Sequence, residues 1–222
     1  MDVISHPSPN HGPRRDGLCP ELIVVHYTAM AHAEAALERL CSPEFEVSAH
    51  YLIGQNGAVY QLVDEAARAW HAGVGQWGGR GDINSRSIGI ELDNTGATPF
   101  AAPQMDALEA LIDGIRARWD IASKGVIAHS DFAPARKCDP GHRFDWARLA
   151  RGGRSVWPNE THATPDTTEF LQEAQRFGYP SEEGLEVILK AFRQRFRPCA
   201  TGPLCAQDMG MILDLANRYP AG

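Results

Sequence analysis

The residues best suited to chemistry lie in one short segment, residues 129–141, which reads HSDFAPARKCDPG. This segment combines an imidazole, an ammonium group and a carboxylate. His129 follows the apolar run 125–128, which is typical of a buried strand, and the proline and glycine breakers that follow favour an irregular loop. We expect His129 and Asp139 to converge on one metal ion, with Lys137 pointing into the same cleft. A surface loop with a capping aspartate and a solvated lysine is the alternative.

A third protein ligand is needed, because a catalytic zinc commonly has three ligands from His and carboxylate groups and an open position for water. His26 is the candidate. It ends the apolar run 22–25, at the point where a buried strand would emerge. A histidine in such a place can also be a hydrogen-bonded core residue, and the sequence leaves this alternative open.

Glu91 is the candidate for proton transfer. It lies in another apolar run, SIGIEL at 87–92. Burying an unpaired carboxylate is costly, so a glutamate that faces the interior needs a cation, a hydrogen-bond donor or a catalytic task. A glutamate on an exposed edge strand would need none of these.

The periodicity of the chain predicts an α/β fold, in which helices flank a mixed central sheet. The expected elements are a helix at 31–40, a hairpin of 49–53 and 58–63 that turns at Asn56-Gly57, a strand at 88–92, a helix at 103–119 and a strand at 125–129. The last three would form a right-handed crossover. Glu91 and His129 would then lie in one parallel sheet.

The composition changes after the first 150 residues. We expect an α/β domain at 1–150, a linker at 151–167 with scattered glycine and proline, and a small three-helix domain at 168–222. Apolar residues in the last part recur at helical spacing in three blocks, 168–178, 182–196 and 204–218. The basic cluster at 193–197 is expected to be a solvated helix face.

The charge and composition exclude some classes of partner. The 222 residues carry a net charge of −7 without a long basic run, which disfavours nucleic acid, and no apolar run is long enough to span a membrane. Residues 1–20 lack a stretch typical of a signal peptide, and the five cysteines are an odd number, so we expect a cytoplasmic protein. A periplasmic or cell-envelope protein whose leader was removed is the alternative, and Cys199 and Cys205 could then pair.

Five motifs in order carry a family resemblance: IVVHYTA around His26, VSAHYLIGQNGAVYQLV from Val47, AWHAG around His71, SIGIEL around Glu91 and HSDFAPARKCDPG from His129. Together they resemble the zinc-dependent N-acetylmuramoyl-L-alanine amidases of the type-2 superfamily. The likeness is to the branch that acts on anhydro-muropeptides and is related to peptidoglycan recognition proteins. It extends from about residue 22 to residue 149.

The resemblance implies that His26, His129 and Asp139 hold Zn²⁺, that Glu91 is the general base and that Lys137 stabilises the oxyanion. Some relatives use a cysteine as third ligand, and Cys138 precedes Asp139. The family's ligand lies two residues after the lysine, which favours Asp139. Neighbouring side chains in extended backbone also point to opposite sides.

Three further residues are expected to contact substrate. His71 lies beside a Gly-rich stretch that suits a cleft wall, while His50 and Arg86 are weaker candidates, because His50 could be structural and Arg86 ordinary surface. The C-terminal segments FLQEAQRFGYP and VILKAFRQRFRP also resemble, more loosely, a helical peptidoglycan-binding domain. This second resemblance implies glycan binding without assigning contacts.

The expected function is hydrolysis of the amide bond between N-acetylmuramic acid, including its 1,6-anhydro form, and L-alanine of the stem peptide, in cell-wall recycling or remodelling. Its partners would be peptidoglycan fragments or muropeptides. The alternatives are a non-catalytic muropeptide-binding module and a zinc peptidase that acts within the stem peptide. The sequence leaves open the choice between intact peptidoglycan and soluble fragments, and the oligomeric state.

Overall fold

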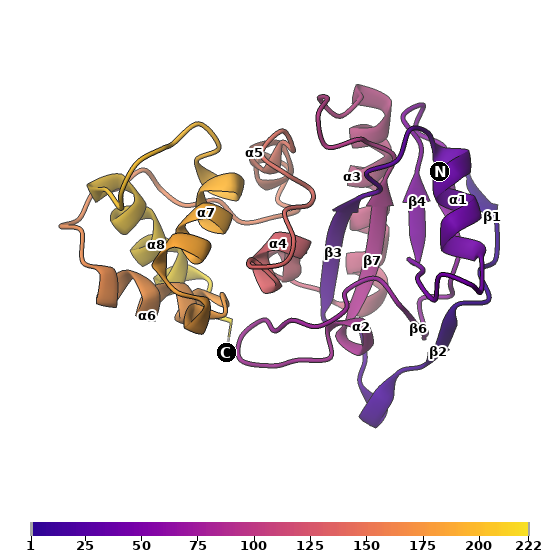
Figure 1. Cartoon of the computed structure of the whole chain (residues 1–222), viewed down its shortest axis with the longest axis horizontal. Helices are drawn as coiled ribbons and strands as arrows, with labels where there is room; N and C mark the ends of the chain where they lie inside the picture. Colours follow the sequence, from indigo (N-terminus) through magenta and orange to yellow (C-terminus); the bar gives the residue numbers. More distant parts are fainter. Residues whose placement is uncertain (1, 222) are drawn as a thin grey trace.

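The computed structural model describes residues 2–221 and contains a six-stranded sheet (Figure 1). The strands lie in the order β1 (Val3–Ser5), β5 (Val59–Gln61), β4 (Tyr51–Ile53), β7 (Ser87–Leu92), β3 (Leu22–Tyr27) and β8 (Val126–Ala128). The β4–β5 pair, which is the predicted hairpin, is antiparallel, and the other four pairs are parallel. The prediction of an α/β fold with a mixed sheet is therefore confirmed.

The register of the three central strands determines which side chains meet. His26 pairs with Glu91 across β3 and β7, and Val25 pairs with Ala128 across β3 and β8. His129 therefore follows directly at the same edge. Because parallel strands end at one edge of a sheet, three polar residues from distant parts of the sequence become neighbours there.

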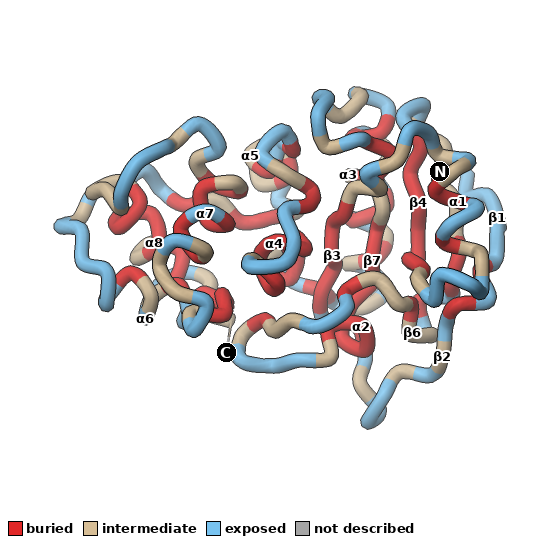
Figure 2. Tube along the Cα trace, viewed as in Figure 1, coloured by how far each residue is buried: buried red, intermediate tan, exposed pale blue. Residues whose placement is uncertain are grey.

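Strand β3 is buried on both faces, which explains its continuous apolar sequence. Ile23 and Val25 pack in a core cluster with the apolar face of α3 (Ala102–Trp119). Helix α3 begins with a proline in its first turn, and its last residue is followed by Asp120, whose φ is 53°. The alternate residues Leu22 and Val24 pack in a different cluster, and Figure 2 shows the strand buried along its length.

That second cluster includes three C-terminal helices, α6 (Thr167–Phe177), α7 (Leu185–Phe196) and α8 (Ala206–Arg218). They correspond to the three helical blocks expected from the sequence. Their apolar residues, among them Phe170, Phe192 and Ile212, share one core with Leu22, Val24 and Ile127 of the sheet. In Figure 1 these helices lie on the side of β3 opposite to α1 (Ala33–Cys41).

Several short elements were not predicted from the sequence. They are β1, the antiparallel pair of β2 (His11–Pro13) and β6 (Ala67–Ala69), α2 (Ile83–Arg86), α5 (Trp146–Arg151) and the 3-10 turns Arg15–Gly17, Ser123–Gly125 and Ser181–Glu183. The segment after β8 was expected to be irregular, but it begins with one helical turn, α4 (His129–Phe132). Asp131 stabilises this turn by accepting a hydrogen bond from the backbone N–H of Ala128.

The expectation of a solvated basic face at 193–197 was wrong for two residues. Arg193 and Arg195 are buried, and they form ion pairs with Asp208 and Asp131. Helical periodicity assigns charged residues to solvent and cannot reveal a buried acidic partner from another element.

All five cysteines are free. Within residues 2–221, none of the helices has both the length and the apolar character needed to cross a bilayer.

Candidate active site

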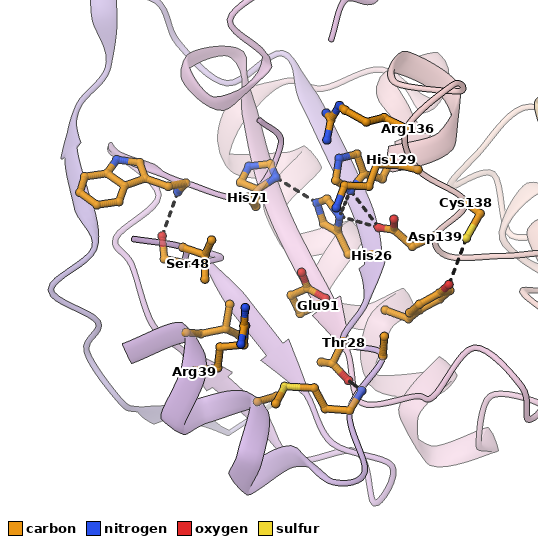
Figure 3. A pocket seen from close by; sticks show the side chains of 18 residues that line it. His26, Thr28, Arg39, Ser48, His71, Glu91, His129, Arg136, Cys138 and Asp139 are labelled. Atoms are coloured by element: carbon orange, nitrogen blue, oxygen red, sulfur yellow. Dashed lines mark hydrogen bonds and ion pairs between the residues drawn. The ribbon is translucent and has the colours of Figure 1, made fainter. Parts of the chain in front are cut away.

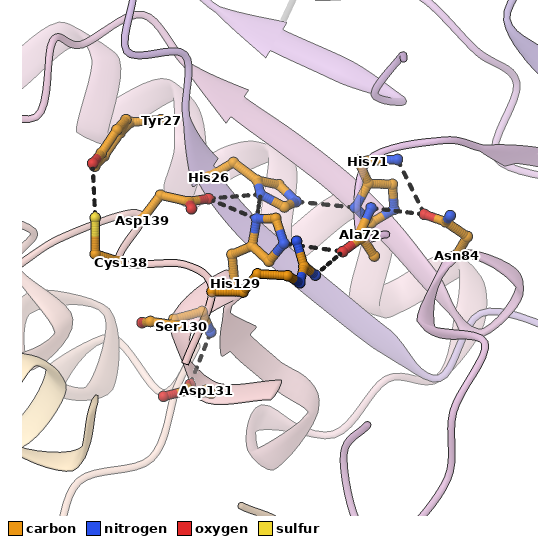
Figure 4. A network of polar contacts seen from close by, with 12 residues as sticks. His26, Tyr27, His71, Ala72, Asn84, His129, Ser130, Asp131, Cys138 and Asp139 are labelled. Carbon is orange, nitrogen blue, oxygen red and sulfur yellow. Dashed lines mark hydrogen bonds and ion pairs between the residues drawn. The ribbon is translucent and has the colours of Figure 1, made fainter. Parts of the chain in front are cut away.

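Three side chains converge at the edge where β3 and β8 end. The Nδ1 atoms of His26 and His129 are 2.9 Å apart, and Oδ2 of Asp139 lies 2.8 Å and 3.0 Å from them (Figure 4). His26 ends β3, His129 begins α4, and Asp139 follows in the next loop. All three are buried. The structure thus brings together the three residues that were predicted to be metal ligands.

The second nitrogen of His129 fixes the tautomer of its ring. Nε2 lies 3.0 Å from the carbonyl oxygen of Ala72, which can only accept, so Nε2 carries the hydrogen. The lone pair of Nδ1 then faces His26 and Asp139. Metal-binding histidines are commonly oriented in this way.

A chain of hydrogen bonds fixes the tautomer of His26 by the same logic. The hydroxyl of Ser87 donates to the carbonyl oxygen of Ile83 at 2.6 Å, so it accepts from Nε2 of His71 at 3.2 Å. Nδ1 of His71 is then an acceptor, and Nε2–H of His26 donates to it at 3.0 Å. Nδ1 of His26 is therefore free to bind a cation.

The electrostatics of the cluster favour added positive charge. Burial lowers the pKa of His129 to about 4 and that of His71 well below its ordinary value. Burial opposes the charge of Asp139, but its close contacts with the rings of His129 and His26 outweigh burial and depress its pKa. Burial also opposes charge on His26, yet Glu91 and Asp139 raise its pKa. Both carboxylates therefore favour positive charge at His26, and a bound cation would supply such a charge.

Glu91 lies next to this cluster on β7, and Figure 3 shows it beside His26 in the cleft. Its Oε2 atom is buried and has no hydrogen-bond partner among the described residues. Burial raises the pKa of Glu91 to about 7, although His26 opposes the shift. A carboxyl group with this pKa can both take up and release a proton near neutral pH.

The cluster opens into a cleft of about 420 Å³. Glu91 and the exposed Lys137 line it, as do Arg39 of α1, Trp70 and Arg136. The side chain of Arg136 donates to the carbonyl oxygen of Ala72 at 3.0 Å. The sequence did not single out Arg39 or Arg136 as cleft residues, because each is one arginine among many.

Of the three residues expected to contact substrate, His71 lines the cleft, whereas His50 and Arg86 make buried structural contacts. His71 lines the cleft but also hydrogen-bonds His26. His50 is fully buried: its Nδ1 accepts from the backbone N–H of Gly89 at 3.0 Å, its Nε2 lies 3.2 Å from the carbonyl oxygen of Ala67, and burial lowers its pKa to about 3. These contacts support the structural alternative for His50.

Arg86 is not brought to the cluster. It precedes β7, so it lies at the opposite end of the strand from Glu91. Its guanidinium group is buried, pairs with Glu21 at 2.5 Å and donates to the carbonyl oxygen of Arg80 at 2.6 Å. These contacts give Arg86 a structural task in holding the Gly-rich loop.

Comparisons with known proteins identify the family of the chain. The family model of N-acetylmuramoyl-L-alanine amidase matches residues 16–142, which is more than half of the chain. The chain belongs to this amidase family. AmiD from Escherichia coli K12 is 35% identical over 90% of this chain and 83% of its own length, and the 1,6-anhydro-N-acetylmuramyl-L-alanine amidase AmpD from Enterobacter cloacae is 36% identical over 67% of this chain and 89% of its own.

Solved amidase structures superpose over nearly the whole chain. AmiD from E. coli, solved with the substrate anhydro-N-acetylmuramic acid-L-Ala-D-gamma-Glu-L-Lys, gives a TM-score of 0.82 at 33% identity and covers 93% of each chain. AmpDH3 from Pseudomonas aeruginosa, solved with anhydromuramic pentapeptide, gives 0.83 at 30% identity over 91% of this chain and 93% of its own. The similarity therefore includes most of the C-terminal part as well as the amidase region.

Proposed function

We propose that this protein is a zinc-dependent N-acetylmuramoyl-L-alanine amidase. It would hydrolyse the amide bond between N-acetylmuramic acid, including the 1,6-anhydro form, and L-alanine of the stem peptide. The observation that carries the proposal is the convergence of three ligand atoms within 3.0 Å of one another beside Glu91, whose buried Oε2 has no partner among residues 2–221. Family membership and the substrate named in the AmiD structure support the same bond.

His26, His129 and Asp139 would hold the ion. Two imidazole nitrogens and one carboxylate oxygen are a donor set that zinc accepts in catalytic sites, and both imidazoles have their Nδ1 lone pairs available. When bound, zinc supplies a water of lowered pKa and polarises the carbonyl group that is attacked.

The chain's own residues would move the protons. Glu91 would take a proton from the attacking water and deliver it to the leaving nitrogen of L-alanine, so that the amine departs neutral. The raised pKa of Glu91 suits both steps. The ammonium group of Lys137 would oppose the negative charge that develops on the carbonyl oxygen. No covalent bond between enzyme and substrate is required.

Product analysis tests the proposal. A defined anhydro-muropeptide would be incubated with the protein as purified, after chelation and after zinc is restored, and the products identified by mass spectrometry. We expect free stem peptide, lost on chelation and regained with zinc. Intact substrate in all three samples would favour a binding module, and cleavage within the stem would favour a peptidase.

A further inference from the structure

Helix α7, outside the region matched by the family model, contacts the segment that carries two of the proposed ligands. Nε2 of Gln194 donates a hydrogen bond to the carbonyl oxygen of Cys138 at 2.5 Å, and Cys138 immediately precedes Asp139. The same amide lies 3.2 Å from the hydroxyl of Ser130, which immediately follows His129. One side chain of α7 therefore contacts the neighbours of both ligands.

The segment has an internal link at the same place. The backbone N–H of Ser130 donates to the carbonyl oxygen of Asp139 at 3.1 Å. Gln194 thus contacts both ends of the segment from His129 to Asp139, and the backbone bond between Ser130 and Asp139 already joins these two ends. Loss of the Gln194 amide would leave the carbonyl oxygen of Cys138 without that donor, and the segment between His129 and Asp139 would lose one of its contacts with α7.

The next residue of α7 holds the turn that carries His129. Arg195 forms an ion pair with Asp131, and both side chains are almost fully buried. Asp131 also accepts from the hydroxyl of Tyr179 at 3.0 Å, and Arg195 donates to the carbonyl oxygen of Val126 in β8 at 3.0 Å. Breaking a buried pair of this kind destabilises a protein strongly, so Arg195 is a poor probe of the metal site alone.

We propose that α7 positions the metal site, with Gln194 as the positioning residue that fixes Asp139 relative to His129. The inference rests on the proposed function, because it requires that these two residues bind metal. Outer contacts of ligands typically change metal affinity 10- to 100-fold when they are removed. Gln194 acts through the backbone beside a ligand, so we expect the lower end of this range.

The test compares Gln194→Ala and Gln194→Glu in the full chain. Glutamate has nearly the same shape, but its carboxylate cannot donate to the carbonyl oxygen of Cys138. We expect the zinc dissociation constant, measured by chelator competition, to rise about 10-fold in both variants. The melting temperature of the metal-free protein should change little, because Gln194 is only half-buried. Lys190→Ala is the matched control, since Lys190 is an exposed residue of the same helix.

Three results would overturn the inference. The first is an unchanged dissociation constant in both Gln194 variants. The second is an equal loss of affinity in Lys190→Ala, and the third is a loss that only follows a lower melting temperature of the metal-free protein. Failure of the wild-type chain to bind zinc would be distinguishable from these results, because it removes the proposed function as well.

Discussion

At the residue scale, the burial of Glu91 is hard to explain by a contribution to the free energy of unfolding. Its carboxylate is held at a strand end beside His26, with one oxygen buried and unpartnered. A buried polar atom without a partner costs free energy that an apolar side chain would avoid. The catalytic role that we propose would account for an acid at this position, since a group with a raised pKa is useful in proton transfer.

Replacement of Glu91 by glutamine should separate metal binding from turnover. Glu91→Gln keeps the shape of the side chain but cannot accept the proton of the attacking water. We expect zinc content to remain at the wild-type level and kcat to fall by about two to four orders of magnitude. Metal analysis and kinetics on the same sample would measure both, and near wild-type kcat would exclude Glu91 as the general base.

Residue types and positions at strand ends predicted His26 and His129, whereas Asp139 was preferred to Cys138 because the family resemblance places a ligand two residues after Lys137. The hydrogen-bond chain from Ser87 through His71 to His26 could not be predicted. It depends on the approach of a loop residue to a strand, and neither residue has a sequence signal for that contact. Arg86 illustrates the same limit, because a polar loop residue can face either the cleft or the protein interior.

At the element scale, β7 determines where the ring of His71 can lie. A Cβ atom on Gly89 would be 2.5 Å from Cγ of His71, which is far closer than real contacts. The ring also packs against those of His26 and His50, with centroids 5.1 Å and 5.8 Å away. The ring therefore has little freedom to move aside, and the strand needs a glycine at this position.

Gly89→Ala should consequently disturb both packing and metal binding. Overpacking of this kind typically costs about 1–3 kcal/mol in the free energy of unfolding, and displacement of His71 should also weaken zinc binding. Urea unfolding of the metal-free protein and chelator competition would measure the two effects. Gly12→Ala in β2 is the control, because a Cβ there meets no atom within 4 Å. Equal changes in unfolding free energy and zinc affinity for Gly89→Ala and Gly12→Ala would contradict this account.

An ion pair links α7 to α8: Arg193 of α7 pairs with the buried Asp208 of α8. The ionisation of Asp208 should affect how the free energy of unfolding depends on pH. Burial opposes the charge of Asp208, but hydrogen bonds from Arg193, Cys205 and Arg197 outweigh it and lower its pKa to about 2. Because the pKa is lower in the folded state than in the unfolded chain, the stabilisation is complete above about pH 4 and is lost as the pH falls towards 2.

Asp208→Asn should therefore lower stability at neutral pH and have less effect in acid. We expect a difference from wild type of about 2 kcal/mol at pH 6, shrinking steadily between pH 4 and pH 2. Thermal melts across this range would give the difference. Asp2→Asn, which changes an exposed acid, should leave the melts unaltered. A difference that stays constant down to pH 2 would show that the carboxylate charge is not responsible.

Sequence periodicity located the long helices and central strands well, because each has a sustained apolar pattern. It missed β1 and β2, which have three residues each and are largely exposed, so no pattern can develop. It also assigned Arg193 and Arg195 to solvent, although both are buried in ion pairs with Asp208 and Asp131. Pairing between elements is a tertiary property that a single helix pattern does not contain.

At the scale of the whole molecule, the sheet and the C-terminal helices share one apolar core. Leu22, Val24 and Ile127 of the sheet belong to the same buried cluster as Phe192 of α7 and Ile212 of α8. A separate satellite domain would need a core of its own. The shared core leads us to expect that the sheet and these helices unfold together.

The tryptophans allow a test if three of them, Trp77, Trp146 and Trp157, are first replaced by phenylalanine, because these three contact Phe177, Arg195 and Phe196 of α6 and α7. The remaining signal then comes from Trp70 and Trp119, which lie outside α6, α7 and α8. Phe192→Ala removes a fully buried ring from α7, which typically costs about 3–5 kcal/mol. In a chain of this size we expect the melting temperature to fall by roughly 10 °C. The midpoint from tryptophan fluorescence should fall together with that from far-ultraviolet circular dichroism. A fluorescence midpoint that stays unchanged while the helices melt earlier would show two independent units.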